Sequence, residues 1–207
     1  MQKINAKRWL SGILAAILLL AVFPLGTFAE EGDLTITTKE ELLQFAQSVS
    51  GGESYTGKTV VLAANLSLAG EDFAGIGSSA APFKGTFDGQ NHIVSDLSSS
   101  VGFFADVNGG TVKNLIVRGM VNGASNIAGV VGKLTAGAVQ NCGNEASVSG
   151  GANVGGVVGS VNGDCTVSGC YNSGAVSGTT GYIGGVTGQH WRAGTVENCY
   201  NIGTVSG

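Results

Sequence analysis

The sequence has little charge, few basic residues and almost no proline. Charged residues make up 12% of the 207 residues, prolines number two, and fourteen aspartates and glutamates outnumber ten lysines and arginines. An acidic balance without a basic patch argues against nucleic acid or an anionic membrane surface as the partner. The length suits one domain.

Motifs for catalysis and for metal binding are also missing. The chain contains no Gly-x-Ser-x-Gly, His-Glu-x-x-His or Cys-x-x-Cys pattern. His92 and His190 are the only histidines, and neither lies at ligand spacing or beside a nucleophile pattern. We therefore expect no catalytic residue, no cofactor and no metal site.

The first 29 residues have the organisation of a secretory signal peptide. Basic residues at positions 3, 7 and 8 precede an apolar run from Leu10 to Phe23, and Thr27 and Ala29 are small residues before the predicted cleavage point. The alternative is an uncleaved N-terminal anchor. Removal of residues 1–29 leaves seven basic and fourteen acidic residues, a formal charge of 7 − 14 = −7. We expect a secreted, extracellular protein, free or associated with the cell surface, without a membrane span in the mature chain.

Glycine is abundant, and its placement reveals a long internal repeat. The 36 glycines follow no three-residue period, which excludes collagen. Successive units begin at Gly102, Gly129, Gly156 and Gly185, spaced 27, 27 and 29 residues apart. Further equivalent positions hold Val112, Val139, Val167 and Val196; Asn114, Asn141, Gly169 and Asn198; Leu115, Cys142, Cys170 and Cys199; and Val121, Val148, Val176 and Val205. A fixed period of this length indicates stacked structural repeats.

Each unit consists of three short strand-like pieces separated by glycine- or asparagine-bearing corners. Such strands cannot enclose a core alone, but stacked copies pair their backbones about 4.8 Å apart and bury a continuous column. We therefore predict an all-β fold, a right-handed parallel β-helix. Its middle strand would turn Val112 and its equivalents inward and Lys113, Gln140, Ser168 and Glu197 outward. In the first strand the pattern does not decide between Val130 and Val131. An antiparallel β-sandwich is the alternative.

The part of the chain before the repeats differs in pattern. A capping box at Thr38 to Glu41 and an apolar face from Leu42 to Val49 predict a helix over about residues 39–50, ended by Gly51 and Gly52. Short strand patterns follow, and the helix is expected to cover the open N-terminal end of the coil stack. This divides the chain into a signal peptide (1–29), a cap with irregular coils (30–100) and four repeat coils (101–207).

The repeated phrases resemble the GLUG motif of bacterial secreted and surface proteins. The phrases are Gly129-Val-Val-Gly132, Gly156-Val-Val-Gly159 and Gly185-Val-Thr-Gly188, together with the Cys-Tyr-Asn sequences that begin at Cys170 and Cys199. The same repeat is found in N-terminal regions of immunoglobulin A peptidases. The resemblance implies a secreted or surface-attached β-helical region, often within much longer proteins. Since the sequence ends at Gly207 without a polar capping unit, we expect a truncated chain, with end-to-end stacking of a short protein as the alternative.

The cysteines are interpreted first as core residues. Cys142, Cys170 and Cys199 share a position that Leu115 occupies in the first unit, so the slot is apolar, and a free thiol behaves there as a small hydrophobe. A disulfide among these three, or with Cys165, is the alternative in an exported protein, because adjacent rungs come near the required separation.

The most mixed chemistry lies at His190, Trp191 and Arg192, in the longer unit. We interpret these residues as a partner-contact loop for an extracellular protein or glycan, with a tolerated insertion as the alternative. The expected function is that of a non-catalytic adhesive, ligand-binding or spacer region. One alternative is the non-catalytic N-terminal part of a secreted metallopeptidase. A polysaccharide-active β-helix enzyme is the least favoured, because Asp88, Asp96 and Asp106 form the only close acidic group and no basic residue is placed beside them.

Overall fold

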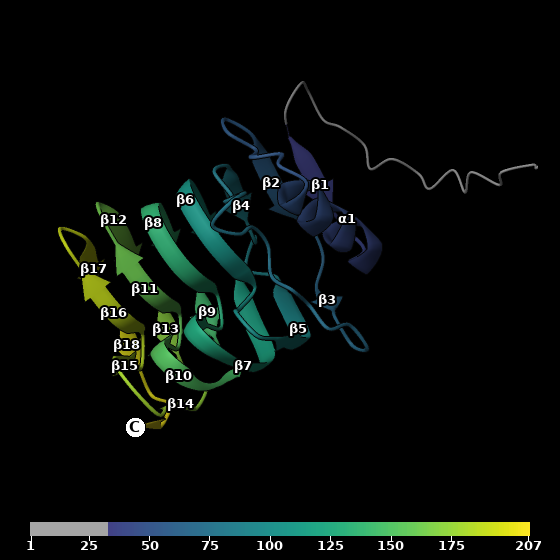
Figure 1. Ribbon diagram of the computed structural model, residues 1–207. Coiled ribbons are helices and arrows are strands. Elements are labelled where there is room, and N and C mark those ends of the chain that lie inside the picture. The colour runs from purple at the N-terminus through teal and green to yellow at the C-terminus, as the bar shows by residue number, and fades with distance from the viewer. Residues whose placement is uncertain (1–32) are drawn as a thin grey trace, which may run out of the picture.

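The structure, a computed structural model, describes residues 33–207 and is a parallel β-helix of stacked coils (Figure 1). All paired strands in its two sheets run parallel, so the antiparallel sandwich alternative was wrong. The predicted signal peptide, residues 1–29, lies outside the described part. Within residues 33–207, no helix is long and apolar enough to cross a membrane.

Two sheets form the walls of the coil stack. The first sheet contains β1 (Leu34–Ile36), β2 (Thr59–Leu62), β4 (Thr86–Asp88), β6 (Phe104–Lys113), β8 (Val131–Gln140), β11 (Val158–Asn162), β12 (Cys165–Ser168), β16 (Thr187–Trp191) and β17 (Thr195–Glu197). The second sheet contains β3 (Leu66–Ser67), β5 (Ile93–Ser99), β7 (Ile116–Ala128), β9 (Gly143–Asn144), β10 (Ser147–Gly155), β13 (Tyr171–Asn172), β14 (Val176–Gly178), β15 (Ile183–Gly184), β18 (Tyr200–Asn201) and β19 (Val205–Ser206).

The predicted helix is confirmed as α1 (Lys39–Ser50), and it lies across the N-terminal end of the stack (Figure 1). The hydroxyl of Thr38 accepts the Glu41 N–H at 3.2 Å, and the Glu41 carboxylate accepts the Thr38 N–H at 3.1 Å. This reciprocal pair satisfies two of the donors that a helix start leaves free. The buried face of α1 then shields the β1 end of the first sheet, as the apolar spacing predicted.

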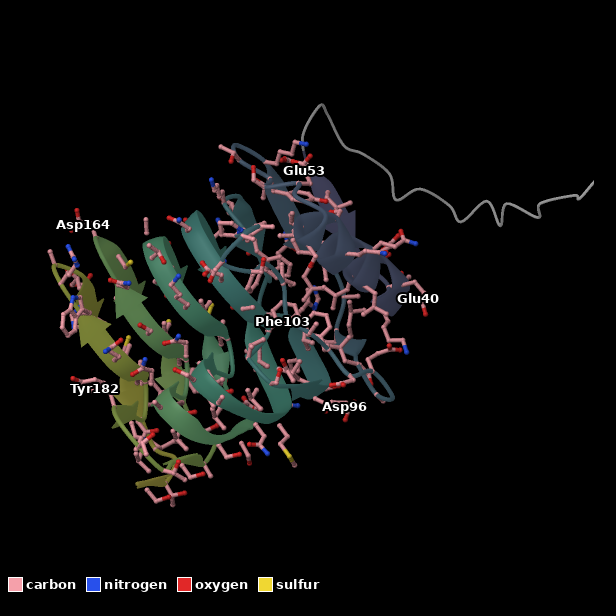
Figure 2. All side chains as sticks on the ribbon, in the orientation of Figure 1. Glu40, Glu53, Asp96, Phe103, Asp164 and Tyr182 are labelled. Carbon is pink, nitrogen blue, oxygen red and sulfur yellow. The ribbon has the colours of Figure 1, made fainter. Side chains whose placement is uncertain are left out.

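The core beneath α1 is aromatic. Phe45 from the helix meets Phe83 at 5.8 Å and Phe87 at 6.0 Å between ring centroids. Phe103 and Phe104 continue this group into the first regular coil and are fully buried. Figure 2 shows Phe103 inside the stack, whereas Asp164 and Tyr182 lie on the periphery of the last coils. The widest side chains therefore fill the coils nearest the cap.

The predicted register of the middle strand is confirmed. Val112 pairs with Val139, Val139 with Val167, and Val167 with Val196. The sequence did not decide which valine of the first strand points inward. In the structure both do, since Val130 and Val131 are fully buried, as are Val157 and Val158. The chain turns a corner between the two valines of each pair, so both side chains reach the interior and alternation does not hold there.

The repeat lengthens at two places, and neither is the His190 region. Val161 pairs with Leu134, 27 positions away, but Thr166 pairs with Ala138, 28 positions away. One extra residue therefore lies between residues 161 and 166, where β11 and β12 are separate strands. The offset increases again from 28 at Gly178 to 29 at Ile183. It is still 29 at His190, so that residue is in register with Val161 below it.

Candidate binding surface

The first glycine of each Gly-x-x-Gly phrase faces an inward asparagine. A Cβ on Gly129 would collide with the side-chain oxygen of Asn144, and a Cβ on Gly156 would collide with Asn172. Gly185 has the same relation to Asn201. The two phrases of the repeat are therefore packed against each other across the interior, and glycine is required because an asparagine occupies the space.

The second glycine of each phrase allows the corner to close. A Cβ on Gly132 would lie 2.5 Å from the carbonyl oxygen of Asn126, and one on Gly188 would lie 2.7 Å from the Val154 backbone. Gly159 meets the Asn126 and Ile127 backbone in the same way. These contacts leave no room for a side chain, so the phrase serves backbone packing rather than ligand recognition.

The inward asparagines form a hydrogen-bonded ladder at a position that the sequence pattern did not single out. The amide of Asn144 donates to the side-chain oxygen of Asn172 at 2.6 Å, and Asn172 donates to Asn201 at 2.6 Å. Each amide also donates to the backbone carbonyl two residues on, at 2.8 or 2.9 Å. Asn144 and Asn172 are fully buried, and these bonds satisfy groups that would otherwise be costly to bury. The Cys-Tyr-Asn repetition was the signal for this ladder.

The predicted corner asparagines occupy a different position. Asn114, Asn141 and Asn198 have φ values of 54°, 52° and 53°, and Gly169 at the equivalent place has 64°. This left-handed conformation suits asparagine and glycine. Asn141 donates to Asn114 at 3.4 Å, but Gly169 has no side chain and interrupts the row.

All four cysteines are free thiols, and three of them, Cys142, Cys170 and Cys199, are stacked in one column. Cys142, Cys165 and Cys170 are buried, and Cys199 in the last coil is partly exposed. The Cys142 N–H donates to the sulfur of Cys170, and the Cys170 N–H donates to that of Cys199, both at 3.4 Å. Burial raises the pKa of the Cys142 thiol well above its ordinary value, and burial also raises the pKa of Cys199. Cys142 and Cys199 are therefore poor nucleophiles, whereas the hydrogen bond with Cys142 holds the pKa of the Cys170 thiol below its ordinary value.

The placement of His190, Trp191 and Arg192 in a loop needs correction, whereas their role in contacting a partner stays a prediction. His190 and Trp191 belong to β16, where they pair with Val161 and Asn162 of β11. Only Arg192 lies in the following corner, with φ at 77°. All three are exposed, Trp191 by 53%. His190 continues the column of Leu134 and Val161, so it is a polar residue on a core column rather than the tip of a loop.

The three carboxylates considered for polysaccharide cleavage lie in separate networks. Asp88 contacts Lys113 at 3.2 Å, Asp96 accepts from Ser67 at 2.6 Å, and Asp106 contacts Lys133 at 3.2 Å. Hydrogen bonds from Ser67 and Ser95 hold the pKa of Asp96 below its usual range. In residues 33–207, no group of three His, Cys, Asp or Glu side chains could hold a metal ion. Lysines therefore lie beside two of the three carboxylates, so the expectation that no basic residue is placed beside them was wrong.

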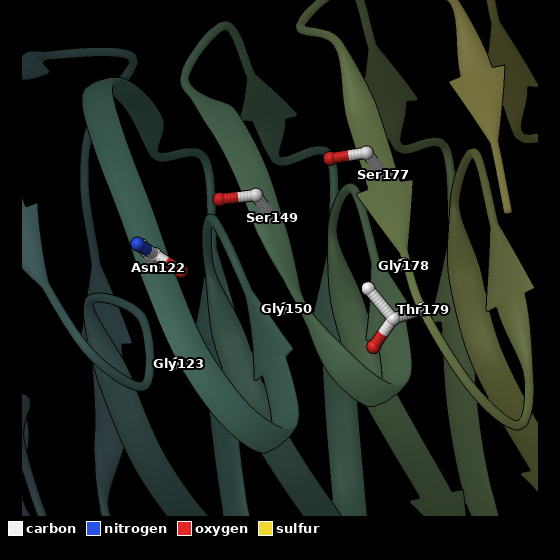
Figure 3. Close-up of a pocket in the computed structure, with 7 residues that line it drawn as sticks. All are labelled: Asn122, Gly123, Ser149, Gly150, Ser177, Gly178 and Thr179. Atoms are coloured by element: carbon white, nitrogen blue, oxygen red, sulfur yellow. The ribbon is translucent and has the colours of Figure 1, made fainter.

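A shallow groove of 320 Å³ lies on the outer face of the second sheet (Figure 3). Asn122, Ser149 and Ser177 project into it from β7, β10 and β14 at successive paired positions. Gly123, Gly150 and Gly178 form its floor, and Thr179 forms one rim. Every lining residue is uncharged. Thr179 lies between Gly178 and Ile183, where the repeat gains its second extra residue. The lengthening of the repeat is therefore beside this groove and not at His190.

Comparison with known proteins supports the repeat assignment. Residues 179–206 match the family model described as the GLUG motif, as the repeated phrases predicted. The fold resembles a Bacteroides ovatus crystal structure described as "a putative immunoglobulin A1 protease", with a TM-score of 0.64 and 19% identity. That likeness covers 86% of this chain and 78% of the other, and at this identity it shows the fold alone. No curated protein matches the sequence.

Proposed function

Because the chain carries the GLUG motif on a parallel β-helix, we propose that it is a secreted, non-catalytic region that binds a glycan or protein along the groove of β7, β10 and β14. The observation that carries this proposal is the uncharged row of Asn122, Ser149 and Ser177. Paired strands hold these groups about 4.8 Å apart. A ligand with regularly spaced hydroxyl or amide groups can therefore meet several of them without ordering a loop first.

The test is to fill the groove without disturbing the core. Ser149 and Ser177 are outward residues, so the double variant Ser149→Arg/Ser177→Arg should fold normally and block the groove. Ser168→Arg, an outward position on the other sheet, is the matched control. Binding to a glycan array and to immobilised fibronectin and collagen is measured for all three proteins. We expect at least one probe to bind both the wild type and the control. The double variant should bind that probe with roughly tenfold lower affinity. A probe that binds all three equally contradicts the groove assignment, and the absence of any bound probe favours a spacer role.

A second candidate is the non-catalytic part of a secreted protease. The support is the fold shared with the Bacteroides ovatus protein over most of both chains. In that role the β-helix would hold a substrate for a separate catalytic domain. Immobilised immunoglobulin A1 is the probe, and we expect this chain to bind it while gel electrophoresis shows the heavy chain intact. Failure to bind immunoglobulin A1 removes this candidate and leaves the first one untouched.

A further inference from the structure

A second cavity lies where the irregular coils meet the first regular coil. It has a volume of 240 Å³ and is lined by residues of β6, β7 and β8 and by the connection between β3 and β4. Asp106 and Lys133 are adjacent partners in the first sheet and both line the cavity. The equivalent positions in the next coils are Ser160 and Gln189, so the charged pair occurs once in this column.

The covering loop, residues 77–82, is anchored at both ends on β6. Ile76 bridges Phe104, and Phe83 bridges Val107. The Phe83 N–H donates to the Asp106 carbonyl at 3.1 Å. Gly77 has φ at 80°, and a Cβ there would lie 2.6 Å from that same carbonyl. The loop is therefore held close over the Asp106 side chain, and this approach needs a glycine.

The polar groups of the cavity are arranged around one buried carboxylate. Asp106 is 4% exposed, and its Oδ2 accepts from both Lys133 and Ser79 at 3.2 Å. Among residues 33–207 no hydrogen bond reaches its Oδ1, and this oxygen is not among the fully enclosed unsatisfied atoms. Asn126 accepts from Asn153 at 2.8 Å through its oxygen, which leaves its amide N–H groups free. An acceptor and several donors thus face one small space.

We propose that this cavity binds a single neutral sugar residue. Its volume is below the roughly 300 Å³ at which drug-sized pockets begin, which suits one ring. Asp106 and Lys133 cancel each other's charge, so a charged ligand gains little, whereas hydroxyl groups can donate to Oδ1 and accept from Lys133 and Asn126. The side chains of Val101 and Ala105 supply an apolar wall for the C–H face of a sugar. This site is separate from the groove and does not depend on it.

The experiment is a ¹H–¹⁵N NMR titration of the full mature chain with methyl glycosides of galactose, glucose, mannose, fucose and N-acetylglucosamine. N-acetylneuraminic acid, an anion, and glycine, a zwitterion, serve as ionic comparisons. We expect at least one neutral glycoside to shift the amides around Asp106 and Ser79, with a dissociation constant on the order of 1 mM. Asp106→Asn should weaken binding roughly tenfold, because a charge-assisted bond is lost. Ser79→Ala, on the exposed loop, should weaken it roughly threefold while leaving the melting temperature unchanged.

The matched control is Lys113→Met, which removes an ion pair of the same kind on the same sheet, outside the cavity. The Lys113→Met variant should bind the glycoside as tightly as wild type does, whereas Lys133→Met should bind it more weakly. The groove variant Ser149→Arg/Ser177→Arg should also bind normally, which separates this site from the proposed function. The inference is overturned if no neutral glycoside shifts these amides, if only the charged compounds do, or if Ser79→Ala and Asp106→Asn bind as tightly as wild type.

Discussion

The coils near α1 and the coils of the repeat fill their interiors by different means. In the first region the offset between paired residues varies from 22 at Ser99 and Val121 to 28 at Leu66 and Val94, and phenylalanines fill the interior. In the second region the offset stays between 27 and 29, and valines, cysteines and asparagines recur in columns. Large rings can fill cross-sections that change from coil to coil, whereas a buried polar ladder needs an identical neighbour above or below it.

The asparagine ladder ends one coil before the regular region ends. Asn144 pairs with Val117 of the first regular unit, and Val117 pairs with Val94 of the irregular coils. Asn144 can be the last member because its side-chain oxygen accepts the Ala146 N–H at 3.2 Å and is not left unsatisfied. Buried polar groups are costly unless their hydrogen-bonding atoms have partners. This column thus changes from polar to apolar within the repeat, between Asn144 and Val117, one coil away from the irregular region.

The strongest test of this contrast uses one column that passes through both regions. Phe87 pairs with Val112, which pairs with Val139, so the three residues are structurally equivalent. Phe87→Ala should cost about 3–5 kcal/mol in the free energy of unfolding, since it empties the centre of the aromatic cluster. Val139→Ala should cost about 1.5–3 kcal/mol. Urea denaturation followed by circular dichroism measures both values. Equal costs would show that the aromatic cluster has no special part in the first region.

The next largest effect is expected at the centre of the ladder. Asn172→Ala removes bonds to both neighbouring asparagines, so it should cost about 2–4 kcal/mol through groups left unsatisfied in the interior. The control is Asn141→Gly, which removes an exposed corner asparagine but keeps the left-handed backbone accessible. It should cost less than about 1 kcal/mol. Similar losses in the two variants would mean that the buried ladder adds nothing.

A double-mutant cycle sharpens the same point. Gly156→Ala alone should be strongly destabilising, because the new Cβ meets the Asn172 side chain and the Gly185 carbonyl. In the Asn172→Ala background the side-chain clash is gone, so part of that cost should disappear. We expect a coupling energy of about 1–3 kcal/mol in the free energy of unfolding. Strict additivity of the two substitutions would show that the glycine phrase and the asparagine ladder are independent.

Features that depend on repetition could be predicted from the sequence, whereas features that depend on side-chain packing could not. The helix, the parallel coils and the valine register followed from capping residues, strand length and a fixed period. The inward position of Asn144 and its equivalents did not, because asparagine at a corner and asparagine in a core column look alike in one sequence. The two places where the repeat lengthens were also hidden, since a change in total spacing does not say where the extra residue lies. Pairing to the coil below placed one of them at the groove and removed His190 from consideration as an insertion.

A smaller effect is expected in the thiol column. Cys142→Val replaces a buried thiol with an apolar group of similar size, so it should change the free energy of unfolding by less than about 1.5 kcal/mol. The single Cys142 S–H is a weak donor with two alternative carbonyl acceptors, at 3.3 Å and 3.7 Å, and Leu115 fills the same slot in the preceding coil. Thermal and urea denaturation under reducing conditions give the comparison. A loss as large as that of Asn172→Ala would make the thiols a polar ladder in their own right.

The smallest effect on stability is expected for Tyr171 and Tyr200, a pair of stacked rings on the outer face of the coils. The rings stack at 5.7 Å, and the Tyr171 hydroxyl donates to Glu145 at 2.7 Å. That bond holds the pKa of the Glu145 carboxyl below its ordinary value, and burial, followed by Glu145, raises the pKa of Tyr171 to about 12.

Tyr171→Phe should therefore raise the pKa of Glu145 toward its ordinary value, which a carboxyl NMR titration measures directly. The cost in stability should be less than about 1 kcal/mol at neutral pH, because the pair is partly solvated. A carboxyl with a lowered pKa in the folded state contributes stability that is complete above its unfolded pKa and disappears as the pH falls through its folded pKa. The difference between wild type and Tyr171→Phe should thus vanish in acid. A difference that persists there would assign the effect to ring packing instead of to the hydrogen bond.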